Sequence, residues 1–416
     1  MPLLTYATAS LATGLLAVSA SRLGSVGWRT AVSNLRGRSL RRQEQLRLRR
    51  ETQHARLASE LSWQTSSVSD TAWRVVEVVE IVDESIDCRS FYLQDPCGGT
   101  LPTFQPGQFV AVRPALGGLG QPTRCYSLSD SPSQAWWRIS VKRQQPLSVN
   151  QRPGLSVWLH QRIGVGDCLL INGPSGQFTI DSQSTAPIVF LAAGIGITPI
   201  VSMLKHVLEV QPGRPMQIHF QAQDEQHWPF GRQLHAWQAV CSAMQVSTYL
   251  SRGSTLPTVE HGRVVTGKFD AHSIVSAPDY STDAQFYICG PDAWTKALTT
   301  GLVDNNVPAD RIHLESFGGA PPALPEQQTT LAPWSLHFTD SSLTVATSNE
   351  PTTIWQAAKQ CGLELPAACH TGACGTCRLK LRAGSIRYAQ QPSASVAAGD
   401  VLACIAQPVG NVEVEA

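Results

Sequence analysis

The sequence has almost no excess charge, and it lacks a dense cysteine framework and any internal repeat. Its formal net charge is +1 over 416 residues, which does not suggest a nucleic-acid-binding protein. Eleven cysteines in a chain of this length are too sparse for a secreted disulfide scaffold. The length exceeds what one hydrophobic core supports and predicts two to four domains.

Most of the cysteines are isolated from one another in the sequence. We expect these seven to be buried thiols of a reduced cytosolic chain: Cys88, Cys97, Cys125, Cys168, Cys241, Cys289 and Cys361. The remaining four gather near the C-terminus and need a different explanation.

Residues 1–21 contain no charged side chain, but hydroxyl residues and glycine dilute their apolar character. As a helix they would be about 31 Å long, close to the hydrocarbon thickness of a bilayer. Ten arginines between Arg22 and Arg56 then favour a membrane anchor that leaves the catalytic domains on the cytoplasmic side. A mitochondrial transit peptide, a cleaved secretory signal and a surface helix of a cytoplasmic protein stay open. Residues 22–71 predict a basic helical linker.

The rest of the chain changes character three times. Residues 72–182 hold short β-rich runs between Gly/Pro turns, which predict a small antiparallel barrel. Residues 183–319 alternate apolar strands with helical stretches, which predict a parallel sheet with β-α-β connections. A Pro-rich linker is expected over residues 320–332. Residues 333–416 predict strands, one helix and a cysteine-rich loop.

Two stretches of the predicted barrel have the chemistry to bind a phosphate or a flavin ring. RCYSLSD, residues 124–130, places a guanidinium and hydroxyl groups at a strand end. Residues 154–156 form a predicted small-residue turn whose N–H groups can approach a pyrophosphate. Each pattern is of low specificity by itself.

Two loops of the predicted parallel sheet are typical of nucleotide binding. AAGIGITP follows an apolar strand and precedes a helix, and Gly194 and Gly196 let the backbone approach a phosphate. The third glycine of the full dinucleotide fingerprint is missing. A second strand ends in ICGPD, residues 288–292. Because the carboxyl ends of parallel strands line one crevice, we expect both loops to face one ligand.

The most specific pattern is CHTGACGTC, residues 369–377. Cys369, Cys374 and Cys377, followed by the distant Cys404, have the spacing of plant-type 2Fe–2S ferredoxins. Structural zinc normally uses two short Cys-x2-Cys pairs and only one is present, so zinc stays as the alternative. We interpret His370 as a loop residue and not as a ligand.

Together these motifs resemble the ferredoxin–NADP reductase superfamily joined to a C-terminal plant-type ferredoxin domain. Similar proteins include the reductase components of oxygenases and the reductase half of flavohaemoglobins. The resemblance covers residues 72–416. It implies a flavin-binding antiparallel β-barrel, an α/β parallel-sheet nucleotide domain and a β-grasp ferredoxin domain, to which the sequence adds an N-terminal helix.

The resemblance also implies a role for each motif residue. The catalytic residues are implied to be Tyr126, Ser127, Cys289 and Glu315. The cofactor-binding residues are implied to be Arg124, Tyr126, Ser127, Gly154, Leu155, Ser156, Gly194, Gly196, Ile197, Thr198, Pro199, Gly290, Pro291 and Phe317. The metal ligands are implied to be Cys369, Cys374, Cys377 and Cys404.

The resemblance implies three cofactors or co-substrates: FAD, a 2Fe–2S cluster and NAD(P)H. The pyrophosphate turn favours FAD over FMN. Ser251 and Arg252 are similar to a pair that holds a 2′-phosphate, but other expected partners are not evident, so NADH and NADPH both stay open.

The expected function is a reductase that passes electrons from NAD(P)H through FAD and the cluster to an acceptor such as an oxygenase or a cytochrome. Residues 1–71 are too short for a globin, so we expect no flavohaemoglobin activity. Two alternatives from other classes are a non-enzymatic iron–sulfur redox sensor and a zinc-stabilised interaction module.

Overall fold

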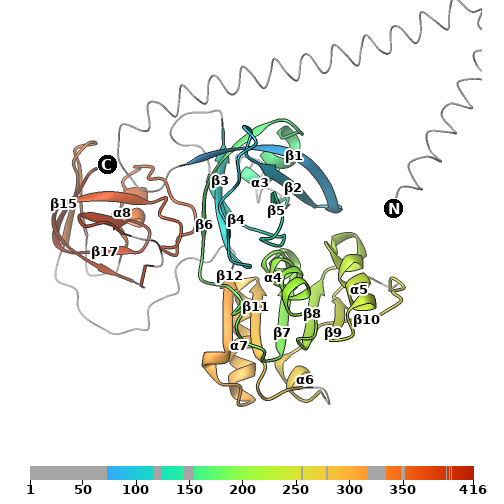
Figure 1. Cartoon of the computed structure of the whole chain (residues 1–416). Coiled ribbons are helices and arrows are strands. Elements are labelled where there is room, and N and C mark those ends of the chain that lie inside the picture. The colour runs from blue at the N-terminus through green and yellow to red at the C-terminus, as the bar shows by residue number, and fades with distance from the viewer. Residues whose placement is uncertain are drawn as a thin grey trace, which may run out of the picture. The chain divides into compact units, whose positions relative to one another are not determined.

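The computed structural model describes residues 73–115, 123–144, 154–253, 256–277, 280–316, 334–347, 352–389, 391–392, 394 and 396–416 (Figure 1). All of them belong to one compact unit from Val68 to Ala416. The predicted segments 1–21, 22–71 and 320–332 lie outside the described residues. Among the described helices, none is both long and apolar enough to cross a membrane.

The first sheet is an antiparallel barrel. Its strands are β1 (Arg74–Ser85), β2 (Cys88–Gln94), β3 (Phe109–Pro114), β4 (Arg124–Ser127), β5 (Trp137–Lys142) and β6 (Cys168–Ser175), in the order β4-β3-β6-β1-β2-β5. A bridge between Leu128 and Ile139 connects the two edges of the sheet. Helix α3 (Leu155–Arg162) inserts the buried Leu155 and Leu159 into the barrel core.

Alternating apolar residues explain why this sheet closes on itself. Val76 and Val78 of β1, together with Phe91 and Leu93 of β2, are fully buried. They pack with apolar residues of the other strands into one core. Because side chains alternate between the two faces of a strand, this pattern places one face of the sheet inside.

The second sheet is fully parallel. Its strands are β7 (Ile188–Ala193), β8 (Met216–Ala222), β9 (Met244–Leu250), β10 (Arg263–Thr266), β11 (Gln285–Gly290) and β12 (Ile312–Ser316), in the order β10-β9-β8-β7-β11-β12. The strand order reverses between β7 and β11. That reversal is the topological switch point at which open α/β sheets bind ligands.

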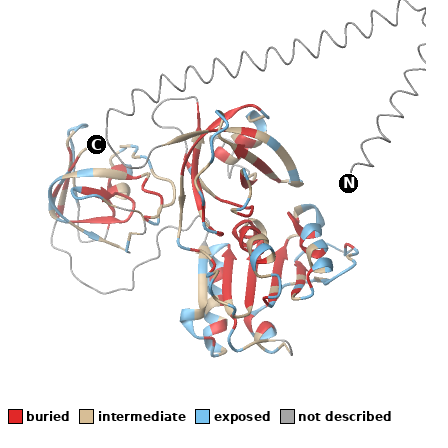
Figure 2. Cartoon of the chain, in the orientation of Figure 1, coloured by how far each residue is buried: buried red, intermediate tan, exposed pale blue. Residues whose placement is uncertain are grey.

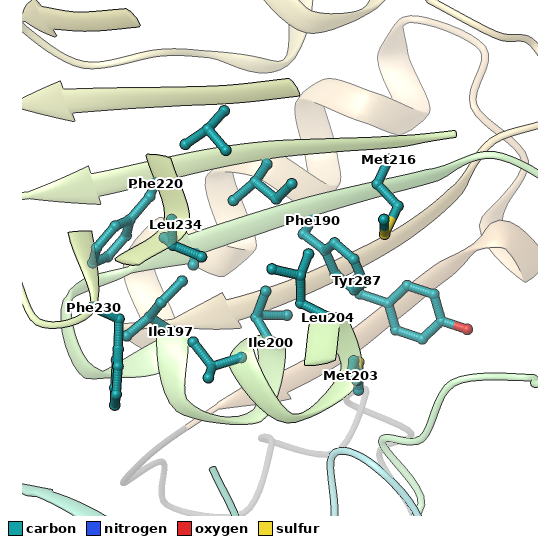
Figure 3. Packing of buried hydrophobic residues seen from close by; sticks show 14 of the residues in the cluster. Phe190, Ile197, Ile200, Met203, Leu204, Met216, Phe220, Phe230, Leu234 and Tyr287 are labelled. Atoms are coloured by element: carbon teal, nitrogen blue, oxygen red, sulfur yellow. The ribbon is translucent and has the colours of Figure 1, made fainter. Parts of the chain in front are cut away.

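Helices cover both faces of the parallel sheet, whose central strands are buried (Figure 2). These helices are α4 (Ile197–Val210), α5 (Gly231–Val240), α6 (Ala271–Val275) and α7 (Asp292–Asp304), and single 3-10 turns occupy Gly194–Gly196, Glu225–His227 and Ala309–Arg311. On one face, Ile197, Ile200 and Leu204 of α4 lie against Phe190 and Phe220 (Figure 3). Helices α6 and α7 contribute to a separate core on the other face.

The third sheet is mixed. Its strands are β13 (Trp334–Phe338), β14 (Leu343–Thr347), β15 (Arg378–Tyr388), β16 (Asp400–Leu402) and β17 (Ala406–Val414), in the order β14-β13-β17-β15-β16, and only β13 and β17 pair in parallel. Helix α8 (Ile354–Gln360) begins at a capping box formed by Thr353 and Gln356. Its buried Ile354 and Ala357 pack into the core of this sheet.

The three sheets confirm the predicted fold class of barrel, parallel-sheet and β-grasp domains. The prediction of seven buried single thiols is only partly right. Cys88, Cys168, Cys241 and Cys289 are buried, whereas Cys125 and Cys361 are half-buried. Cys97 is exposed, since it lies in a turn next to two glycines rather than on a strand.

A buried polar cluster joins the barrel to the parallel sheet. Asp130 and Arg138 of the barrel each keep only 3% of their side chain exposed, and their nearest charged atoms are 3.6 Å apart. Lys205 of α4 pairs with the same carboxylate, and the Ser202 hydroxyl donates to the Asp130 carbonyl at 2.7 Å. The Arg138 guanidinium also lies over the Phe230 ring, 5.0 Å from its centroid.

We expect Asp130→Ala to destabilise the protein by about 3 kcal/mol, because it leaves the Arg138 charge buried without its carboxylate. The control is Asp283→Ala, which removes an exposed partner of Arg311 and should cost less than about 1 kcal/mol. Urea unfolding followed by circular dichroism measures both. Equal losses in the two variants would contradict the role of the buried cluster.

Candidate functional site

The structure brings together the sulfurs of the four predicted metal ligands. Cys369, Cys374 and Cys377 lie in the loop before β15, and Cys404 follows β16. The Cys377 and Cys404 sulfurs are 3.0 Å apart. The sulfur of Cys369 interacts with the side chains of Cys374 and Cys404. Because β15 and β16 pair side by side, residues distant in the sequence supply one set of donors.

Backbone amides of the same loop point at one of these sulfurs. The amides of Thr371, Ala373 and Cys374 donate to Cys369 Sγ at 3.5, 3.4 and 3.3 Å. Hydrogen bonds from the Cys374 and Cys404 side chains, and from Thr371, hold the pKa of the Cys369 thiol far below its usual range. Sulfur contacts raise the pKa of the Cys374 and Cys404 thiols well above the ordinary value. The thiols thus share protons, which iron has to displace because it binds the thiolate form.

The loop conformation depends on a glycine. Gly372 has a φ of +71°, and a Cβ atom there would lie 2.3 Å from Ile405 Cδ1. Its neighbour His370 also adopts a positive φ, of 56°, and its ring contacts Trp355 with a centroid distance of 4.5 Å. The histidine ring therefore packs on helix α8, in keeping with the interpretation of His370 as a loop residue.

These sulfurs fit the donor set of a 2Fe–2S cluster. Three of the four cysteines are almost completely buried, with exposed fractions of 3%, 2% and 2% for Cys374, Cys377 and Cys404. Within the described residues, no group of three or more His, Cys, Asp or Glu side chains is arranged to hold a single metal ion. The Cys377 sulfur instead contacts that of Cys404, and the Cys369 side chain interacts with those of Cys374 and Cys404.

Strand β4 positions the predicted flavin-binding residues by alternation. Tyr126 packs on the barrel core together with its strand partner Val110. Burial raises the pKa of its hydroxyl well above the ordinary value, so the phenol stays protonated. Ser127 is buried, whereas Arg124 is exposed at the start of the strand and donates to the Thr123 carbonyl at 2.8 Å.

The predicted pyrophosphate turn is instead the beginning of a helix. Gly154 is the N-cap of α3, and Leu155 and Ser156 form its first turn. The Ser156 hydroxyl accepts from the Gln144 amide at 3.2 Å. Since Leu155 is buried in the barrel core, this motif offers a ligand its backbone N–H groups and not the leucine side chain.

The two predicted nucleotide loops lie in contact. A Cβ atom at Gly196 would lie 2.2 Å from the Cys289 carbonyl oxygen and 2.8 Å from the Gly290 nitrogen, so only glycine permits this approach. Gly194 has a φ of +55° and open space around it. The loops after β7 and β11 are thus adjacent at the switch point, in line with the prediction that they face one ligand.

The side chains around these loops divide between core and surface. Ile197, Thr198 and Pro199 are all buried in the first turn of α4, and Ile197 belongs to the hydrophobic core. Their contribution to a ligand is therefore limited to backbone groups. Pro291 is the N-cap of α7, and Phe317 lies outside the described residues.

Three of the predicted catalytic residues meet beside these loops. Cys289 and Glu315 are direct partners in neighbouring strands, and Cys289 is completely buried. Ser127 of the barrel approaches the Glu315 carboxyl. Both Ser127 Oγ and Glu315 Oε2 are buried without a hydrogen bond of normal geometry. A buried polar atom without a partner requires an explanation, and these two atoms fit a bound ring with donors and acceptors of its own.

The charge state of Glu315 follows from its burial. Desolvation raises the pKa of its carboxyl from 4.5 to about 8, against a smaller lowering by Ser127. Burial, and then the nearby Glu315, also raise the pKa of the Cys289 thiol well above its ordinary value. At neutral pH both side chains are therefore uncharged, so neither places a fixed charge beside the nucleotide loops.

The structure adds one contact that the sequence did not predict. The loop of Cys369 and Cys374 packs on the outer face of the barrel, against Phe109 and Ala111 of β3 and Cys125 of β4. Cys125 stands between two predicted flavin-binding residues. The only sequence signal for this contact is that Cys125 is the second residue of the Arg-x-Tyr-Ser motif. In the sequence it counts as one of the seven isolated thiols.

Comparison with known families agrees with this arrangement. Residues 338–409 match the 2Fe-2S iron-sulfur cluster binding domain, and residues 190–299 match the oxidoreductase NAD-binding domain. The chain thus contains an oxidoreductase NAD-binding domain followed by a C-terminal 2Fe–2S cluster binding domain. This confirms the predicted likeness to ferredoxin–NADP reductases fused to a ferredoxin.

Sequence relatives match the reductase part of the chain. The flavohemoprotein of Bordetella pertussis is 35% identical over 255 residues, which are 60% of this chain and 61% of that protein. Flavohemoprotein A of Dictyostelium discoideum is 31% identical over 242 residues, 57% of this chain and 58% of that protein. The chain thus spans about three fifths of the length of these relatives.

Solved structures share the fold. The flavohem-like FAD/NAD binding domain of nitric oxide dioxygenase from Vibrio cholerae is 26% identical, with a TM-score of 0.52 over 59% of this chain and 99% of that domain. Phthalate dioxygenase reductase is 22% identical, with a TM-score of 0.52 over 83% of this chain and 98% of that one. The second match includes all three domains.

We expect Glu315→Gln to remove a pH dependence of stability. The folded protein keeps the proton on Glu315 up to about pH 8, whereas the unfolded chain releases it near pH 4.5. This stabilising contribution is complete below the unfolded pKa and is lost as the pH rises through the folded pKa. The free energy of unfolding should fall by about 1 kcal/mol per pH unit in that window.

Thermal unfolding of the wild type and of Glu315→Gln between about pH 6 and pH 8 measures this effect. Glu260→Gln, at an exposed position, is the matched control. The wild type and the control should lose stability with rising pH more steeply than Glu315→Gln. Parallel pH profiles for all three proteins would contradict the buried, protonated carboxyl.

Proposed function

We propose that this protein takes electrons from NADH or NADPH onto FAD and passes them singly, through a 2Fe–2S cluster, to an acceptor such as an oxygenase or a cytochrome. The observation that carries the proposal is the packing of the Cys369–Cys374 loop on strands β3 and β4. One face of β4 carries Arg124 and Tyr126, two of the predicted flavin residues, and its other face meets the predicted cluster ligands through Cys125.

The cofactors supply the redox chemistry. When bound, FAD accepts a hydride and releases its two electrons one at a time, and a 2Fe–2S cluster takes one electron at a time. The residues of this chain bind, orient and insulate these groups.

The barrel would hold the flavin. Arg124 supplies an exposed guanidinium, Tyr126 a protonated phenol, and Ser127 a buried hydroxyl without a partner of normal geometry. The N-terminus of α3, capped by Gly154, supplies N–H groups for a pyrophosphate. This second phosphate-binding feature supports FAD rather than FMN.

The parallel sheet would hold the nicotinamide nucleotide at the switch point between β7 and β11. Gly196 lets the first loop lie directly on the Cys289 carbonyl, so that one ligand can contact both loops. Glu315 and Cys289 lie beside this switch point. Because both are neutral, they add no fixed charge next to a hydride path. The Glu315 carboxyl, when protonated, can also donate a hydrogen bond to a ring substituent.

The cluster would then be the exit of the electron path. Three amide donors at Cys369 stabilise the added negative charge on a sulfur ligand. The buried Cys374, Cys377 and Cys404 shield their side of the site from water. Since electrons leave one at a time, one-electron acceptors such as cytochromes or the metal centres of oxygenases suit this chemistry.

Cys377→Ser is expected to separate the two halves of the path. The variant should lose most of its bound iron but keep its flavin, because Cys377 lies in the ferredoxin domain. Anaerobic NADH and NADPH should each be tested for bleaching of the flavin bands. The variant should keep flavin reduction and lose cytochrome c reduction about tenfold or more.

Cys361→Ser is the control, because Cys361 lies in the same domain and its thiol donates to the Ala358 carbonyl. A wild-type protein without flavin bands after reconstitution would overturn the proposal. A protein with flavin and iron that neither nucleotide reduces would instead point to a redox sensor. A colourless protein that holds zinc would point to an interaction module.

We also propose that residues 1–21 attach the protein to a membrane, with the catalytic domains on the cytoplasmic side. Support comes from the uncharged stretch followed by ten arginines between Arg22 and Arg56. The full chain should sediment with membranes and resist carbonate extraction, whereas a chain that lacks residues 1–21 should not. Recovery of a protein cleaved after this segment would indicate a targeting peptide instead.

A further inference from the structure

Cys125 occupies a particular position on the flavin-binding strand. In the register of β3 and β4, Ala111 faces Cys125 and Val110 faces Tyr126. Val110 and Tyr126 contribute to the barrel core. Because side chains alternate along a strand, Cys125 and Ala111 share the outer face of the barrel.

That outer face is covered by the cluster loop. Ala111 is completely buried there, and Cys374 keeps only 3% of its surface exposed. Both belong to one apolar cluster, on which Cys125 and Cys369 also pack. Within it, the Cys125 thiol lies beside the Cys374 side chain, and it raises the pKa of the Cys374 thiol.

Cys369 and Cys374 of this loop thus differ in their surroundings. Cys369 is served by three amides of its own loop. Cys374 instead packs against the barrel, on Phe109 and Ala111 of β3, and the thiol of Cys125 lies beside it. A sulfur that binds iron carries no proton, so in the pair with Cys374 the donor has to be Cys125.

We propose that Cys125 is a positioning residue for electron transfer, whose thiol donates a hydrogen bond from the flavin-binding strand to the iron ligand Cys374 and raises the reduction potential of the cluster. The inference rests on the proposed function. Hydrogen bonds to ligand sulfurs favour the cluster with the added electron, because they stabilise its extra negative charge. No covalent bond changes in this role and no proton is transferred.

The same hydrogen bond would couple the two redox sites. Cys125 is the direct neighbour of Arg124 and Tyr126, which are proposed to hold the flavin. Cys125 would then contribute both to the contact between the two domains and to the tendency of the cluster to accept an electron from the flavin.

The test compares substitutions at Cys125 in the full-length protein loaded with FAD and iron. Cys125→Ala and Cys125→Val remove the donor, and the valine keeps most of the side-chain volume and suits a strand. Cys125→Ser keeps a donor. Cys97→Ala removes an exposed thiol elsewhere and is the control. Iron content, flavin content and the midpoint potential from a titration followed by electron paramagnetic resonance are measured for each.

We expect both donorless variants to bind iron and flavin at wild-type levels and to show a lower midpoint potential of the cluster. Cys125→Ser should lie closer to the wild type, and Cys97→Ala should equal it. Unchanged or higher potentials in Cys125→Ala and Cys125→Val would overturn the inference and leave the proposed function intact. A wild-type protein without an iron–sulfur signal would overturn the proposed function and this inference with it.

Discussion

The contact between the Cys369–Cys374 loop and the outer face of strands β3 and β4 is the constraint on which the rest of the molecule depends. Two redox groups exchange electrons only if the protein holds them close together. Strand β4 meets this requirement through its two faces, since Tyr126 packs inward and Cys125 packs outward on the cluster loop. The loop keeps its shape because Gly372 lies directly against Ile405.

A second close approach organises the nucleotide end. The Gly196 backbone lies on the Cys289 carbonyl, and apolar cores on both faces of the parallel sheet keep these strands in register. The barrel is held to the sheet by the buried charges of Asp130 and Arg138, together with Lys205. In this setting Glu315 is half-buried and its Oε2 atom is buried without a partner, which costs stability at high pH. Such a cost is usual where a ligand is needed to complete the polar contacts.

Much of the fold follows from local patterns. The apolar run at Ile188–Ala193 and the helical pattern of α4 identify a β-α unit without any tertiary information. The barrel strands follow from alternation, and the spacing of Cys369, Cys374 and Cys377 identifies the cluster. The burial of single residues was harder to predict. Cysteine side chains are usually buried, but Cys97 lies in a Gly-rich turn and is exposed.

The limits of prediction at the site are also physical. Leu155 and Ile197 belong to binding motifs, but their side chains fill hydrophobic cores, so only their backbone is available to a ligand. A motif identifies a segment and does not distinguish between these two uses. The buried cluster around Asp130 has no sequence signature, because its members come from a strand end, a neighbouring strand and a helix far along the chain.

The sequence by itself determined the three domain types, the set of four candidate cluster cysteines and the two candidate nucleotide loops. These depend on spacing and periodicity, which short segments carry locally. Only the tertiary structure decided that Ser127 meets Glu315, and that Cys125 meets Cys374. Each of these pairs joins two different domains, and packing between distant segments leaves no pattern in the residues that surround either partner.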